Sequence, residues 1–230
     1  MPSCCAAFPF PKPPCIESRR QKRRSDSSGH PFLSLGTNGL MNSFLLRFFA
    51  DVQALKLWLL SLKHCRCPFC HCAHSLNRHS ILYGNNPNCN NDNKHVRGQR
   101  VFCSNRGQRG GCGRTFSVFL ADVFPRFCVR ASLLWRLLGL LLAGQTVFGA
   151  TPMLRPSFSQ STFYRLVHLL RQRLDILRPL LCRICLAPAS SRSDPLLQTV
   201  EHFKAAFPKS GSPLDSFQAH FQSDLLGSSS

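Results

Sequence analysis

Cys67-Pro68-Phe69-Cys70 decides the fold of this chain, together with a second pair of thiols further along, Cys103 and Cys112. The two-residue spacing lets both sulfurs of the first pair reach one tetrahedral Zn²⁺, and the backbone amides of the turn can steady them. Gly113 follows the last thiol and permits the turn that a metal knuckle needs. The sequence therefore predicts one zinc site with Cys67, Cys70, Cys103 and Cys112 as its ligands.

Three short segments around these thiols have the pattern of strands: residues 75–83, 96–102 and 114–119. The order knuckle, strand, strand, knuckle, strand is that of a zinc ribbon. Since this stretch holds few apolar residues, the metal is expected to supply folding free energy on the order of 10 kcal/mol.

Other residues compete for the role of ligand. Cys103 and Cys112 are separated by an Arg- and Gly-rich insert that is longer than the usual two to four residues. Cys65 and Cys72 flank the first pair, so the register of the ligands can slip. We expect Cys89 to be a free thiol, and Cys182 and Cys185 to lack the two further ligands of a second site. The histidines are expected at the polar surface: His64, His71, His74, His79 and His95.

The charge of the chain points to a polyanionic partner. The sequence has 29 Lys and Arg against 10 Asp and Glu, a formal net charge of +19, which favours phosphate backbones over acidic small molecules. Residues 64–130 carry ten of these cations and two acids, whereas residues 186–230 carry three and four. Seven of the 13 Cys fall between Cys65 and Cys112 with no secretory signal before them, which favours metal binding in a reducing cytoplasm.

The remaining segments predict small modules. Residues 1–40 are expected to be a disordered basic arm, or to precede a true start at Met41. Residues 41–63 predict an amphipathic helix from Ser43 to Leu62 with Ser43 as N-cap, packed on the ribbon at 64–125. Residues 183–230 predict a short helical appendage. We expect no membrane span, because Arg136 and Gly144 interrupt the apolar stretch at 133–150.

Residues 130–182 predict a helical module. Helices are expected over 133–143 and 146–154, and a third begins after Ser159 as N-cap. The core face of the third helix would be Phe163, Leu166, Val167 and Leu170, with Ser161, Thr162, Arg165, Arg171 and Arg173 opposite. Hydroxyl groups followed by Arg suit DNA, because they reach phosphates and guanine edges. The alternative is an ordinary helical hairpin whose Arg face is merely solvated.

The chain resembles a known family in the region 65–175. The resemblance rests on Cys67-Pro-Phe-Cys70, Leu76-Asn-Arg-His79, Arg97-Gly-Gln-Arg-Val-Phe-Cys103 and Cys112-Gly-Arg-Thr-Phe-Ser117. These segments are similar to the zinc ribbon at the N-terminus of bacterial insertion-sequence transposases. In that family a helix-turn-helix commonly follows, and residues 144–147 and 159–165 are similar to its turn and recognition helix.

The resemblance ends before the catalytic part of such transposases, an α/β nuclease domain with three metal-binding carboxylates. After the helices only Asp194, Glu201, Asp215 and Asp224 remain, and about 45 residues cannot build that domain. The resemblance therefore implies DNA recognition in a relative of mobile-element proteins, without strand transfer.

The sequence thus predicts an α+β protein, a β zinc ribbon followed by an all-α helix-turn-helix-like module, that binds duplex DNA and is not an enzyme. The expected nucleic-acid contacts are Arg97, Arg100, Arg106, Arg109 and Arg114 on the ribbon, and Ser161, Thr162 and Arg165 on the third helix. The alternatives are a DNA-binding subunit or truncated remnant that needs a catalytic transposase partner, and an RNA-binding ribbon.

Overall fold

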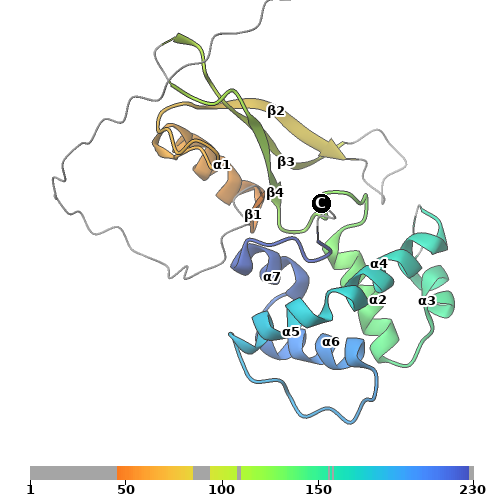
Figure 1. Ribbon diagram of the computed structural model, residues 1–230. Helices are drawn as coiled ribbons and strands as arrows, with labels where there is room; N and C mark the ends of the chain where they lie inside the picture. Colours follow the sequence, from red (N-terminus) through yellow and green to blue (C-terminus); the bar gives the residue numbers. More distant parts are fainter. Residues whose placement is uncertain (1–45, 85–93, 108–109, 155, 157, 228–230) are drawn as a thin grey trace, which may run out of the picture. The chain divides into compact units, whose positions relative to one another are not determined.

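The computed structural model describes residues 46–84, 94–107, 110–154, 156 and 158–227 (Figure 1). These residues form a mixed α+β fold with one four-stranded sheet and seven α-helices, so the predicted fold class is confirmed at that level. The predicted basic arm at 1–40 lies outside the described residues. We call residues 46–123 the sheet module and residues 131–227 the helical module.

The sheet has the strand order β1-β4-β3-β2. Strand β3 pairs antiparallel with both β2 and β4, as expected for three successive strands, whereas β1 joins β4 in parallel. The bounds of the last three strands lie within one residue of those predicted from the sequence. The four strands are β1 (Leu46–Phe49), β2 (Leu76–Gly84), β3 (His95–Cys103) and β4 (Thr115–Leu120).

One face of the sheet builds a small core because side chains alternate along its strands. In β4, Phe116, Val118 and Leu120 are buried, and Val101 of β3 lies opposite Phe116. Leu55 of the helix α1 (Val52–Leu60) packs in this cluster. A short 3₁₀ turn, η1 (Leu62–His64), then leads from α1 to the first pair of cysteines.

The helix predicted from Ser43 to Leu62 is wrong in its first half. Residues 46–49 form strand β1, and α1 begins only at Val52, where the Asp51 carboxylate accepts a hydrogen bond of 2.7 Å from the Ala54 amide. Pairing with β4 satisfies the backbone of this segment and buries Phe48, which local helical periodicity could not reveal. Asp51 is the N-cap in place of Ser43, which lies outside the described residues.

The helical module contains six helices around one core. The predicted face of α4 is confirmed, because Phe163, Leu166, Val167 and Leu170 are all buried. Ser159 holds the N-cap position, and Gly144 follows the end of α2 with a φ of 89°. The helices are α2 (Ala131–Leu142), α3 (Val147–Leu154), α4 (Gln160–Gln172), α5 (Leu174–Cys182), α6 (Pro195–Ala206) and α7 (Pro213–Phe221).

The two C-terminal helices, expected as an appendage, belong to this same core. Phe203 of α6 and Phe217 of α7 stack edge to face with ring centroids 5.3 Å apart, and both side chains are buried with the core residues of α2 and α4. The described part of this segment, residues 183–227, therefore completes the helical module. Among the described residues, no helix combines the length and the apolar character needed to cross a membrane.

Gln218 of α7 and Gln222, the C-cap of that helix, bond through their side chains to the backbone of the sheet module. Gln218 is fully buried; its amide group donates to the carbonyls of Ala121 and Val123, and its carbonyl accepts from the Leu225 amide at 3.1 Å. Gln222 pairs with strand β1, accepting from the Phe48 amide at 3.1 Å and donating to the Phe48 carbonyl at 2.8 Å. These bonds satisfy backbone groups at the end of β4 and on the outer edge of β1.

We expect Gln218→Ala to lower the free energy of unfolding more than the replacement of a polar side chain usually does. It leaves buried backbone partners without hydrogen bonds, and each such group costs about 1–3 kcal/mol. Urea denaturation would measure the loss, with Gln172→Ala as the control, because Gln172 is exposed and bonds to His168 on the same helix. Equal stability losses in the two variants would contradict the role given to Gln218.

Candidate metal centre and basic surface

Four cysteine sulfurs converge at one end of the sheet. The Sγ atoms of Cys67, Cys70, Cys103 and Cys112 lie within 4.8 Å of one another. Cys67 and Cys112 are 3.7 Å apart, and Cys70 and Cys103 are 3.6 Å apart. A tetrahedron of sulfurs around one metal at a Zn–S distance of ~2.3 Å has edges of about 3.8 Å. The four predicted ligands therefore form a cluster that can hold a metal ion.

Secondary structure brings the two pairs together. Cys67 and Cys70 lie in the turn before β2, Cys103 is the last residue of β3, and Cys112 lies in the loop before β4. The antiparallel register sets Leu76 opposite Cys103, so the start of β2 and the end of β3 meet at the cluster. Cys67 and Cys103 are buried in the sheet core, whereas Cys70 and Cys112 are half-buried.

In both halves of the site, the residue that follows the last cysteine has a positive φ. The residue after Cys70 is His71, with a φ of 59°, and the residue after Cys112 is Gly113, with a φ of 72°. Both lie in the left-handed region, which turns the chain sharply after the ligand. Gly111 is needed for another reason, because a Cβ there would approach the Cys103 sulfur to 2.8 Å and collide with the Ser104 carbonyl.

Hydrogen bonds steady the buried sulfurs. The Phe69 amide donates to Cys67 Sγ at 3.4 Å, and the Cys112 amide donates to Cys103 Sγ at 3.3 Å. The hydroxyl of Ser75, a fully buried residue, lies 3.2 Å from Cys103 Sγ. Partners of this kind orient metal ligands. Sequence reasoning missed Ser75, since a single Ser ahead of a strand carries no distinctive signal.

The two thiols of the first pair, Cys67 and Cys70, differ in pKa. Burial raises the pKa of the Cys67 thiol to about 12. The backbone amide of Cys72, the largest influence on Cys70, lowers the pKa of that thiol to about 6. Cys70 therefore gives up its proton more readily than Cys67, and a metal ion that binds both sulfurs displaces the protons that remain. Metal binding then releases protons, so affinity falls as the pH is lowered.

The competing ligands lie outside the cluster. The Cys65 thiol bonds to the Ser61 carbonyl at 3.6 Å, and the Cys72 thiol bonds to the Gly110 carbonyl at 3.1 Å. His64 and His74 are exposed and face each other edge on, with ring centroids 6.1 Å apart. In the part of the chain that the structure describes, no other group of three or more Cys, His, Asp or Glu can hold a metal.

The remaining candidates are placed as follows. His71 and His79 are exposed, as predicted, whereas His95 is half-buried and burial lowers its pKa. Cys182 is exposed and Cys185 half-buried at the end of α5, while Cys89 lies outside the described residues.

Three of the five predicted phosphate contacts on the sheet module are exposed: Arg100, Arg106 and Arg114. The Arg114 guanidinium lies 5.2 Å over the ring of Phe69, which holds it beside the metal cluster. Arg97 has a different role, because it is half-buried and donates to the carbonyls of Phe124 at 2.8 Å and Phe127 at 2.6 Å. Arg109 lies outside the described residues.

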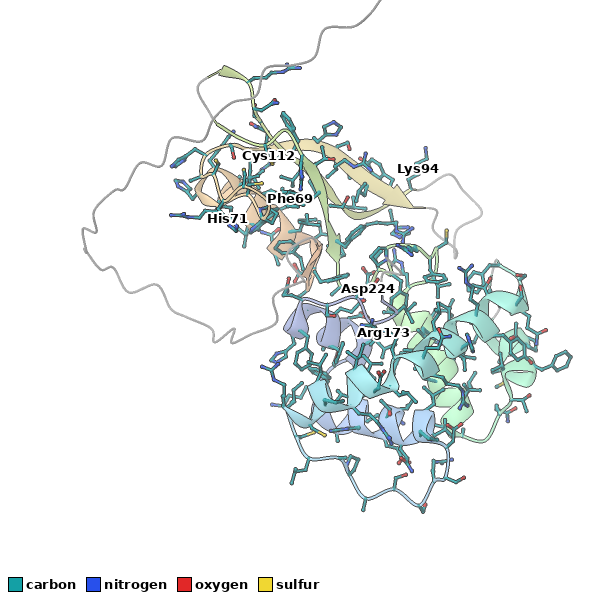
Figure 2. The ribbon with its side chains drawn as sticks, in the orientation of Figure 1. Phe69, His71, Lys94, Cys112, Arg173 and Asp224 are labelled. Carbon is teal, nitrogen blue, oxygen red and sulfur yellow. The ribbon has the colours of Figure 1, made fainter. Side chains whose placement is uncertain are left out.

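On α4, the predicted contact residues are only partly accessible. Ser161 and Arg165 are exposed and Thr162 is half-buried; the Arg165 guanidinium lies 5.5 Å over the ring of Phe127. Arg171 is paired with Asp194 at 2.7 Å, and Arg173 donates to the Asp224 carbonyl at 3.5 Å. Figure 2 labels Phe69, His71 and Cys112 beside one another in the sheet module, and Arg173 and Asp224 in the helical module.

The cations of the sheet module have few acidic neighbours. Residues 46–123 contain eleven Lys and Arg and three acids, Asp51, Asp92 and Asp122. The salt bridges among the described residues involve no Lys or Arg of this module: Arg130–Asp122, Arg171–Asp194 and Arg192–Glu201. Among the described residues, the Lys and Arg around the cysteine cluster are therefore not neutralised by salt bridges.

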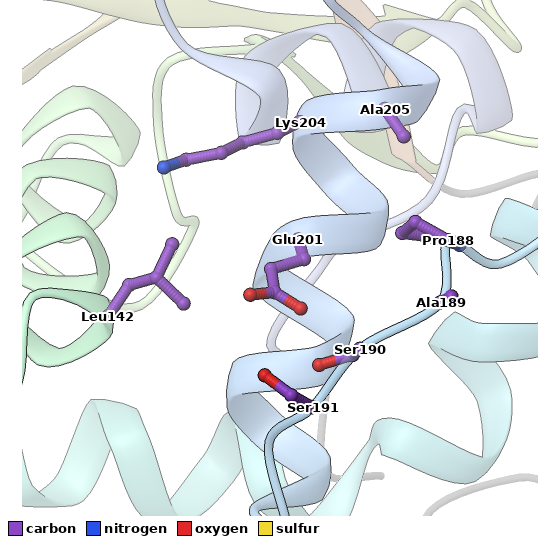
Figure 3. A pocket seen from close by; sticks show the side chains of 8 residues that line it. All are labelled: Leu142, Pro188, Ala189, Ser190, Ser191, Glu201, Lys204 and Ala205. Atoms are coloured by element: carbon purple, nitrogen blue, oxygen red, sulfur yellow. The ribbon is translucent and has the colours of Figure 1, made fainter.

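The carboxylates after α5 serve the helical module itself. Asp194 caps α6 through the Leu196 amide, Asp215 accepts from the Ser212 hydroxyl, and Asp224 accepts from the Leu226 amide. Glu201 lines a shallow, open pocket of about 600 Å³ together with Lys204 (Figure 3). Hydrogen bonds from Ser190 and Arg192 lower the pKa of Glu201, so this carboxylate is committed to the loop beside it.

Comparison with known proteins yields no match: no family model, curated protein or solved structure is similar to this chain. The resemblance to transposase ribbons stays an expectation from the sequence, and function has to be argued from the geometry of the site.

We expect the purified protein to contain about one equivalent of zinc per chain, as a tetrahedral four-cysteine site requires. Cys103→Ser should lose the metal, because a buried ligand is removed, whereas Cys182→Ser should retain it, since Cys182 is exposed and outside the cluster. Elemental analysis of the folded fractions would measure both. Retention of a full equivalent in Cys103→Ser would rule out this ligand set.

We also expect Ser75→Ala to lower the affinity for zinc by about tenfold, as the loss of a partner to a metal ligand commonly does. Chelator competition would measure the affinity, with Ser80→Ala as the control, because Ser80 is exposed on the neighbouring strand β2. If the two variants bind zinc equally well, the Ser75 hydroxyl has no role at the site.

Proposed function

We propose that this chain is a zinc-dependent nucleic-acid-binding protein, with no catalysis of its own and with duplex DNA as its ligand. The observation that carries the proposal is the four-cysteine cluster set among cations that form no salt bridge within the described residues. The cluster supplies the scaffold and the cations supply the binding surface.

The donor set favours zinc in a structural role. Four thiolates in tetrahedral arrangement are soft ligands that select zinc over magnesium or calcium. Catalytic zinc sites keep one coordination position open for water or substrate, whereas structural sites fill all four with protein ligands. Four convergent sulfurs, two of them fully buried, therefore support a closed zinc ribbon.

The charge distribution supports a phosphate backbone as the partner. Lys63 and Arg66 flank the first knuckle, and Arg106 and Arg114 flank the second. All four are exposed and lie outside the described salt bridges. Cations that replace condensed counterions on DNA gain binding free energy from the released ions. The metal-bearing end of the sheet is thus the proposed backbone-contact surface.

The helical module supports duplex DNA. Helix α4 has one face in the core, while its outer face presents Ser161, Tyr164, Arg165 and His168 to solvent. A helix with such a face fits the width of the major groove, where Arg can read guanine. We propose that α4 acts as the recognition helix of a helix-turn-helix, as the resemblance to transposases implies.

Single-stranded nucleic acid is a second candidate, because Tyr83 at the end of β2 is 53% exposed. An exposed aromatic ring on a strand can stack on an unpaired base. A single aromatic ring provides fewer contacts to nucleic acid than the charged surface does, so we prefer duplex DNA as the ligand. Binding to single strands is measured separately in the test below.

The two proposed contact classes predict different mutant behaviour. Arg106→Ala should weaken binding to all sequences alike and lower the salt slope by about one unit, because it removes a phosphate contact. Arg165→Ala should cost on the order of 1–3 kcal/mol at one position of a selected site, because it removes a base contact. Lys209→Ala is the control, as Lys209 is exposed in the near-neutral C-terminal segment.

The measurement is fluorescence anisotropy on a selected duplex, a random duplex and a single-stranded RNA, each at several salt concentrations. An unchanged salt slope in Arg106→Ala would contradict the proposed backbone surface. Unchanged discrimination in Arg165→Ala would contradict the recognition helix, and tighter binding to the single strand would favour the second candidate.

A further inference from the structure

A fifth thiol stands beside the metal cluster. Cys72 is half-buried, and its sulfur donates to the Gly110 carbonyl of the second knuckle at 3.1 Å. The Cys70 side chain is the largest influence on the Cys72 thiol and raises its pKa. Cys72 belongs neither to the set of four ligands nor to the proposed nucleic-acid surface.

The backbone between Cys70 and Cys72 is folded in a way that suits a disulfide. His71, the residue between them, has a φ of 59°, which for a side chain with a Cβ means the left-handed helical region. Residues on either side of a helical residue have Cα atoms about 5.4 Å apart, whichever the hand of the helix. Disulfides commonly join Cα atoms separated by ~5.5–6 Å, so the Cα separation of Cys70 and Cys72 is close to the range that a disulfide spans.

Exposure favours this pair over any pair that includes Cys67 or Cys103. Cys70, Cys72 and Cys112 are half-buried, whereas Cys67 and Cys103 have no exposed surface; of the three half-buried thiols, Cys70 and Cys72 are separated by one residue only. A small oxidant in solution therefore reaches Cys70 and Cys72 before it reaches the buried sulfurs, and oxidation follows access as well as thiolate character.

We infer that Cys70 and Cys72 are a redox modification site, at which a hydroperoxide forms a disulfide and the metal is released. The inference rests on the proposed zinc site, because Cys70 is one of its four ligands. Once Cys70 is in a disulfide, three sulfurs remain, and the closed tetrahedral site is lost. The ribbon then loses the folding free energy that the metal supplies.

The chemistry balances with a hydroperoxide as the oxidant. The Cys70 thiolate attacks the outer oxygen of the peroxide; the S–O bond forms, the O–O bond breaks, and the alcohol or water leaves with a proton from the solvent. The resulting sulfenic acid is attacked by the Cys72 sulfur, which forms the S–S bond and releases water. In total one thiolate and one thiol give up two electrons, the Cys72 thiol and the solvent supply one proton each, and the peroxide is reduced to water and an alcohol, or to two water molecules.

A substitution separates this role from a merely structural one. In Cys72→Ser the hydroxyl can still donate to the Gly110 carbonyl, so the loop keeps its hydrogen bond while the disulfide becomes impossible. Cys65→Ser is the matched control, because Cys65 also flanks the first pair and bonds to a backbone carbonyl, that of Ser61.

The experiment treats the zinc-loaded full-length chain with hydrogen peroxide, follows zinc release with a chromophoric chelator, and then adds dithiothreitol and zinc. Wild type and Cys65→Ser should release about one equivalent of zinc and rebind it after reduction, because a disulfide is reversible. Cys72→Ser should fail to rebind it, because without a resolving thiol Cys70 proceeds to the irreversible sulfinic acid. Peptide mapping of the oxidised wild type should find Cys70 linked to Cys72.

Full recovery of zinc in Cys72→Ser, or a disulfide between Cys67 and Cys70 in the map, would overturn the inference. The zinc proposal fails separately, if the purified chain holds no metal before oxidant is added. In that case the peptide map of the metal-free chain still decides whether Cys70 and Cys72 pair.

Discussion

The convergence of four sulfurs is the constraint on which the sheet module depends. Its core is small, and two of its ten buried residues are the ligands Cys67 and Cys103. Thiols packed this closely gain little from one another, since a buried S–H is a weak donor and a weak acceptor. A metal turns the same four groups into a cross-link between the turn before β2 and the loop before β4. The local geometry serves that purpose, from the left-handed residues His71 and Gly113 to the close approach at Gly111.

The rest of the molecule builds on this cluster in two ways. The Lys and Arg side chains around it repel one another, because few acids lie nearby in the sequence. This repulsion destabilises the fold, and an anionic partner would relieve it. The helical module has the larger core, and it bonds to the sheet backbone through Gln218 of α7 and Gln222, the C-cap of that helix. Arg97 adds a bond in the other direction, from β3 to the carbonyls of Phe124 and Phe127. Loss of the metal is therefore expected to weaken contacts well beyond the cysteines.

Much of the site was accessible from the sequence, because its signals are local. The ligand set followed from the Cys67-Cys70 spacing, from the strand that ends at Cys103 and from the turn that Gly113 permits after Cys112. The buried face of α4 followed from the spacing of Phe163, Leu166, Val167 and Leu170. Arg97 shows the limit of this reasoning. An Arg in a basic strand has the same sequence pattern whether it faces solvent or, as here, donates a hydrogen bond to the carbonyl of a distant turn.

By itself the sequence determined the α+β class, the strands and helices with strong periodicity, and the four thiols that meet, since spacing and alternation act over a few residues. Only the tertiary structure decided that residues 46–49 form a strand, because their backbone partner is β4, some seventy residues away. It also decided that α6 and α7 complete the helical core, that Ser75 lies against the Cys103 sulfur, and that Cys72 stays outside the cluster but beside Cys70. Each of these features depends on a contact between residues that are distant in the sequence, or on a single backbone angle. Neither kind of feature produces a periodic pattern in the sequence.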